Sequence, residues 1–143
     1  MNKLVAALCL CLCLANGALA EELNWQRAHF NYQLFCQGCH TPDGMGANTV
    51  PRMKDQIGHF LNSRAGREYL VRVPGSATST LNDEQLAEVL NWIIQEFAGD
   101  SADESFERYT PLEVAGLRQQ PLNEVEQYRS QLLVDIARAK TRE

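Results

Sequence analysis

The chain has 143 residues, of which 18 are acidic and 13 are lysine or arginine, so its formal net charge is −5 at neutral pH. This length suits one small domain, and the negative charge argues against binding to nucleic acid, which requires a basic face. Five cysteines are present. Three of them fall within residues 9–13, and the two that remain are too few for a disulfide-rich scaffold.

The first twenty residues have the pattern of a cleavable export signal. Lys3 provides the positive charge, residues 4–14 are apolar, and residues 18–20, Ala-Leu-Ala, give the small-x-small pattern that signal peptidase requires. The apolar run is too short to span a membrane, and the leucine before each of its cysteines argues against lipidation. We therefore expect a signal peptide at residues 1–20 and an exported, periplasmic protein without a membrane anchor.

Helices are predicted for most of the remaining chain. The first runs from about Asn24 to Phe35 and carries an apolar stripe. Residues 41–66 are rich in glycine and turn formers, which predicts a loop with short helical turns. Only Tyr69–Val73 has an extended pattern, and the Pro-Gly pair that follows ends it.

The clearest helix is predicted at Asp83–Phe97. Asn82 is a good N-cap, and Gln85 three residues later completes a capping box. The apolar residues then recur at helical spacing, which predicts one wide buried face made of Leu86, Val89, Leu90, Ile93, Ile94 and Phe97.

Residues 98–143 are predicted to form a polar linker and a C-terminal helical extension. One helix begins with the capping box of Thr110 to Glu113 and stops near Pro121. The last begins around Asn123. Its apolar stripe consists of Val125, Tyr128, Leu132 and Ile136. We expect these helices to pack back onto the domain at residues 21–97, because small domains need extra burial; docking onto a redox enzyme is the alternative.

Residues 36–40, Cys-Gln-Gly-Cys-His, carry the strongest functional signal in the chain. Two thiols three residues apart can each add across a vinyl group of one haem, and the following histidine is then placed to ligate the iron. A thioredoxin-like pair would follow a strand, and a structural zinc site would need about four ligands. The motif occurs once. The sequence therefore predicts one covalently attached haem c, held by Cys36, Cys39 and His40.

The stretch from Asn24 to Phe97 resembles a class I cytochrome c. The resemblance rests on the helix that enters the cysteine motif, the run 41–46, Val50-Pro51, Gly58, and the closing helix opened by residues 81–84. It implies an all-α cytochrome c fold of three to four helices around one haem. The first and closing helices would cross near Ala28, Tyr32, Asn91 and Trp92.

The same resemblance assigns roles around the haem. The carbonyl of Pro51 would accept the Nδ1 proton of His40 and so orient the iron ligand. Met53 would pack on the haem, and His59 would lie near a propionate. Three arginines could pair with the haem propionates, although we expect equally that they are ordinary solvated side chains: Arg64, Arg67 and Arg72.

The sixth iron ligand is missing from its usual place. In this family a Met-Pro pair precedes the closing helix, and here the matching pair is Val73-Pro74. Valine cannot ligate iron. The candidates elsewhere are Met45, Met53, His59 and Tyr69. The remaining possibility is an open position lined by Tyr69, Val71 and Val73; we favour this or ligation by His59.

These features predict an electron carrier and not an enzyme. The protein would relay single electrons between a periplasmic dehydrogenase and a downstream acceptor, since no substrate pocket or acid–base pair is evident. The alternative is a haem enzyme or sensor whose open iron binds peroxide or a small gas. The acidic charge suits a redox partner with a basic docking face, or it serves only to keep the protein soluble.

Overall fold

The computed structural model describes residues 23–103 and 105–141, so the predicted signal peptide lies outside the described residues. All regular secondary structure over this part of the chain is helical, which confirms the predicted all-α class. None of the helices described there is long and apolar enough to cross a membrane. The elements in chain order are α2 (Trp25–Phe35), α3 (Gln37–His40), η2 (Ile57–Asn62), α4 (Arg64–Arg72), α5 (Pro74–Ala77), α6 (Asp83–Phe97), η3 (Gly99–Ser101), α7 (Pro111–Leu117) and α8 (Val125–Lys140).

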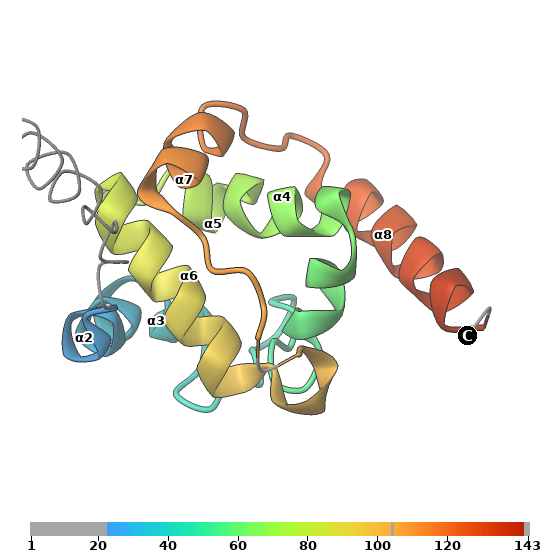
Figure 1. Ribbon diagram of the computed structural model, residues 1–143, viewed down its shortest axis with the longest axis horizontal. Helices are drawn as coiled ribbons and strands as arrows, with labels where there is room; N and C mark the ends of the chain where they lie inside the picture. Colours follow the sequence, from blue (N-terminus) through green and yellow to red (C-terminus); the bar gives the residue numbers. More distant parts are fainter. Residues whose placement is uncertain (1–22, 104, 142–143) are drawn as a thin grey trace, which may run out of the picture.

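Helix α6 runs through the body of the molecule, with α2 and α3 beside it and α8 extending from the opposite side (Figure 1). Its predicted bounds and its capping box are both confirmed. The Asn82 side chain accepts a hydrogen bond from the backbone N–H of Gln85, and the Gln85 side chain accepts one from the backbone N–H of Asn82. Burial extends beyond the predicted face, because Ala87, Glu88, Asn91 and Trp92 are buried too.

Helix α2 packs across α6 through small and aromatic side chains. Ala28 is fully buried at the crossing, and the Tyr32 ring lies 4.9 Å from that of Trp92 and 5.4 Å from that of Phe97, centroid to centroid. The guanidinium of Arg27 donates two hydrogen bonds of 2.7 Å to the Glu88 carboxylate. The small residue lets the two backbones approach, and the ion pair fixes their register.

The expectation of an extended segment at Tyr69–Val73 is wrong. Residues 69–72 form the C-terminal half of α4, and only Val73, the C-cap with φ −59° and ψ 141°, leaves the helical conformation. The Ser63 side chain caps the start of α4 by accepting from the Gly66 N–H. Tyr69, Leu70 and Val71 are aromatic, aliphatic and β-branched, and such a run favours a strand locally. All three are buried, so tertiary packing of an amphipathic helix overrides that preference.

The segment after α6 belongs to the same core. Asn91 of α6 pairs with the backbone of Tyr109, accepting from its N–H at 2.8 Å and donating to its carbonyl at 2.9 Å. The Tyr109 hydroxyl donates to the Arg67 carbonyl, and Val114 of α7 is fully buried. At the C-terminal end of α7, Arg118 donates to the carbonyls of Ala77, Ser79 and Leu81. The predicted extension therefore packs back onto the helices before it.

Replacing Asn91 with alanine should lower the free energy of unfolding by about 2–3 kcal/mol, because the N–H and the carbonyl of Tyr109 would both lose their buried partner. Urea unfolding followed by circular dichroism measures the change. Gln95→Ala, on the exposed side of α6, is the matched control and should cost less than about 0.5 kcal/mol. Equal effects of the two substitutions would contradict the role assigned to Asn91.

Candidate functional site: an apolar cavity beside the cysteine motif

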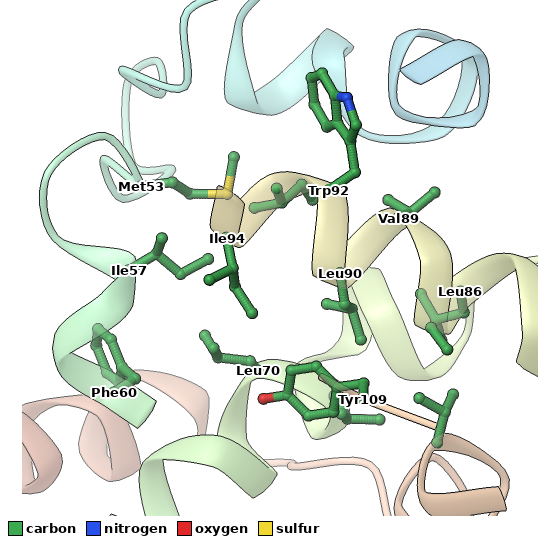
Figure 2. Packing of buried hydrophobic residues seen from close by; sticks show 14 of the residues in the cluster. Met53, Ile57, Phe60, Leu70, Leu86, Val89, Leu90, Trp92, Ile94 and Tyr109 are labelled. Atoms are coloured by element: carbon green, nitrogen blue, oxygen red, sulfur yellow. The ribbon is translucent and has the colours of Figure 1, made fainter. Parts of the chain in front are cut away.

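A cavity of about 500 Å³ lies between α3, η2, α4, α6 and the start of α8. Its volume falls within the range of roughly 300–1,000 Å³ that is typical of cofactor and small-molecule sites. Most of its wall is apolar, and Figure 2 shows Met53, Ile57, Phe60, Leu70 and Leu90, all part of that wall, in the apolar core around Ile94. Cys36, Cys39 and His40 belong to the same wall.

The cysteine motif occupies one tight helical turn. Helix α2 ends at Phe35, and α3 follows at once, with the His40 N–H donating to the Cys36 carbonyl at 3.0 Å. This turn places the two thiols and the imidazole next to the same cavity. Cys36 is half-buried and Cys39 is exposed. Burial, together with the nearby Cys39, raises the pKa of Cys36 to about 11.

The chain leaves the motif through a constrained loop. Thr41 has a φ of 63°, and its carbonyl accepts from the Tyr32 hydroxyl at 2.5 Å. The Gly44 carbonyl accepts from the backbone N–H groups of Met53 and Lys54, which closes the loop. Gly44 itself has a φ of 72°, and a Cβ there would lie 2.8 Å from the Phe97 ring. The closed loop carries Met53 back into the core beside the motif.

His40 is half-buried, and its Nδ1 atom is buried without a hydrogen-bond partner among the described residues. The expected bond to the Pro51 carbonyl is therefore not made. That carbonyl oxygen instead lies beside Gly46, 3.0 Å from the position where a Cβ would stand. Pro51 still lines the cavity. Burial lowers the pKa of His40, which favours the neutral imidazole, the form that ligates metals.

The candidates for a sixth ligand divide into two groups. Met53 and Tyr69 lie in the cavity wall, whereas Met45 is 43% exposed and outside it. His59 is also outside the wall, and its Nε2 lies 2.9 Å from the Lys140 Nζ of α8. Burial and then the Lys140 charge lower the pKa of His59. The structure therefore does not bring His59 together with His40.

The wall formed by α4 and α5 includes Tyr69, Val73 and Pro74. Val73-Pro74, the pair that replaces the expected methionine-proline pair, thus faces the cavity. Val71, expected to line an open sixth position, does not, because it is fully buried in the core. The Tyr69 ring stacks on Phe60 at 5.2 Å, and burial raises its pKa, so its hydroxyl stays protonated at neutral pH.

The three arginines expected near propionates are held elsewhere. Arg67 donates to the Glu113 carboxylate and to two backbone carbonyls of the tail, Arg72 donates to the Gln120 carbonyl, and Arg64 pairs with Glu68. None of the three lines the cavity. The cations that do are Arg52 and Arg129. Sequence reasoning missed Arg129; its spacing four residues after Val125 places it on the side of α8 that carries the apolar stripe, but does not show which helix that side contacts.

Protein side chains alone do not provide a multidentate metal site in the described part of the chain, where no group of three or more His, Cys, Asp or Glu side chains converges. Cys36, Cys39 and His40 do not converge on one point, so they are poorly suited to a bare ion such as zinc, which needs three or four converging ligands. They fit a planar apolar group that brings its own equatorial metal ligands.

The two thiols should differ in reactivity in the reduced chain prepared without a cofactor. Iodoacetamide attacks the thiolate, and a pKa of about 11 keeps Cys36 protonated at pH 8. We expect Cys39, which is exposed, to be alkylated first. The rate at Cys36 should rise steeply between pH 8 and pH 11. Mass spectrometry of peptides from a timed reaction measures both rates, and equal rates at pH 8 would contradict the burial of Cys36.

The cavity wall thus brings the cysteine–histidine motif together with apolar residues from five other segments of the chain: 49–53, 57–60, 69–76, 90–93 and 125–129. Comparison of the chain with protein-family models, with curated proteins and with solved structures finds no match in any of the three.

Proposed function

We propose that the chain is an exported monohaem c-type cytochrome with a cytochrome c fold, and that it carries single electrons between redox proteins. The observation that supports this most directly is the position of Cys36, Cys39 and His40 in the wall of one apolar cavity. A haem bound there supplies exchange of one electron at its iron.

Each part of the wall has a task in this proposal. Cys36 and Cys39 form the thioether tethers, which keep the cofactor on a protein outside the cell. His40 ligates the iron through its neutral imidazole, and Pro51 and Met53 pack beside it. The apolar side chains exclude water, and a dry surrounding is one of the means by which proteins set a reduction potential.

The cavity wall favours transfer of electrons over acid–base catalysis. Apart from the motif, its titratable side chains in the described chain are Arg52, Tyr69, Glu126 and Arg129, and none is a histidine. Arg52 is already hydrogen-bonded to the Lys54 carbonyl and paired with Asp55. A reaction that needs a histidine base near the iron has no candidate there.

A second candidate function follows from Val73. Because an aliphatic side chain faces the cavity at the place of the usual methionine, the iron would keep an open position for a small ligand such as carbon monoxide or nitric oxide. Binding of such a ligand by a sensor or a peroxide-reducing enzyme is the alternative to simple electron transfer.

The attachment chemistry can be tested directly. The full chain, produced together with a c-type haem maturation apparatus, should carry one haem that survives extraction in acidic acetone. Cys36→Ser with Cys39→Ser should lose the covalent haem, because both thioethers are removed. Met45→Leu, at an exposed position of the adjacent loop, should keep it. Intact-mass measurement gives the haem content, and a wild-type chain without covalent haem would refute the proposal.

The sixth position can be tested by restoring a methionine. Val73→Met should abolish the spectral change that carbon monoxide causes in the ferrous protein, and it should raise the reduction potential, because methionine–histidine ligation favours ferrous iron. Val134→Met, on the exposed surface of α8, is the matched control and should change neither. His59→Ala should leave the visible spectrum unaltered, since His59 is outside the cavity wall.

These measurements also separate the two candidate functions. A wild-type ferrous protein that does not respond to carbon monoxide at neutral pH has a closed iron, which removes the sensor function. A rapid and complete response establishes an accessible iron. A loss of low-spin character in His59→Ala would contradict the placement of His59 against Lys140.

A further inference from the structure

Arg129 is the one cation of the cavity wall without a partner in the described chain. No hydrogen bond or ion pair joins its guanidinium to any described residue. Arg52, the other cation of the wall, is held by Asp55. Glu126, one turn before Arg129 on α8, lines the cavity too, yet the two form no ion pair. Arg129 therefore lines a largely apolar space without a direct partner in the described chain, and the Glu126 carboxylate is the nearest opposite charge of the wall along α8.

The surroundings of Arg129 restrict how its side chain can be solvated. It is half-buried, and its guanidinium carbon lies 6.0 Å from the centre of the Phe60 ring. Its charge acts on the Tyr69 hydroxyl, where it opposes the rise in pKa that burial causes. A protonated phenol and a guanidinium are both hydrogen-bond donors, so this side of the cavity offers donors and has no basic acceptor apart from Glu126.

Helix α8 is held in the place that brings Arg129 to the cavity. The Tyr128 ring stacks on the Tyr69 ring at 6.1 Å with an angle of 4° between them, and Leu132 is buried one turn later. The Leu122 N–H donates to the Arg72 carbonyl, which fixes the segment before α8 against the end of α4. The position of Arg129 is thus built by packing and is not that of a freely solvated side chain.

We propose that Arg129 anchors a carboxylate of the bound cofactor, so that the C-terminal helix completes the haem site. The inference rests on the proposed function. Haem combines a flat apolar body with two propionate groups, and the cavity combines an apolar wall with one unpaired guanidinium. An arginine binds a carboxylate in a bidentate manner, with two parallel N–H···O bonds. The extension is then part of the cofactor site and not only a cover for the core.

A binding cycle with two ligands tests the pairing. The full chain is prepared without covalent haem and titrated with ferric haem and with its dimethyl ester, whose propionate charges are removed. Quenching of the fluorescence of Trp25 and Trp92 reports binding. We expect the wild type to bind haem about tenfold or more tightly than the ester, as a charge-assisted pair predicts.

Variants of Arg129 test whether this residue causes the preference for haem over the ester. Arg129→Ala should bind the two ligands equally, while Arg129→Lys should keep part of the preference because it retains a charge. Arg138→Ala, on the same helix but outside the cavity wall, is the control and should behave as the wild type. This cycle isolates the interaction of Arg129 with the propionate from any general effect of the substitution on folding.

Three results would overturn the inference. If Arg129→Ala keeps the preference for haem, even while weakening both ligands by the same factor, the residue acts only on the structure of the apoprotein. If the wild type binds haem and the ester equally, haem binding stands but Arg129 does not bind a propionate. If the wild type binds neither ligand, the proposed function itself fails.

Discussion

The organising constraint of this protein is the amount of apolar surface on α6. Its buried residues point in almost every direction around the helix axis, so no single neighbour can cover them. Helix α2 covers one side through Ala28 and Tyr32, and α7 with the segment before it covers another. Leu90 and Ile93 face the cavity. Because burial of apolar surface contributes roughly 25 cal/mol per Å², these two side chains favour an apolar occupant of the cavity.

The polar contacts of the core are arranged around the same helix. Asn91 is buried, and both ends of its amide are used by the backbone of Tyr109. The Glu88 carboxylate is used by Arg27 of α2. A buried polar group without a partner is costly, so these pairs specify which segments pack on which sides of α6. Two buried atoms of the described chain are exceptions, Nδ2 of Asn31 on α2 and Nδ1 of His40, and of these two residues only His40 lines the cavity.

The parts of this fold that could be predicted are those that depend on near neighbours in the chain. The start of α6 follows from a capping box of residues three apart, α2 follows from an apolar stripe, and the cysteine motif fits in one turn. Residues 69–72 were assigned wrongly because their local preference is for a strand, and only their burial makes them helical. Of the site, the motif, Pro51 and Met53 are found in the cavity wall. Arg129 could not be placed there, because its position depends on how α8 packs against α4.

Helix α8 has a consequence for the time course of assembly. Its main contacts are with η2 and α4, whereas α2 and α6 are joined more extensively. Its opening therefore requires less free energy than separation of α2 from α6. The cavity wall therefore includes a part of the chain, Val125 to Arg129, that can move away while the rest remains folded. In the proposed haem protein, a large rigid cofactor would then enter an already formed core, and this helix would be ordered only afterwards.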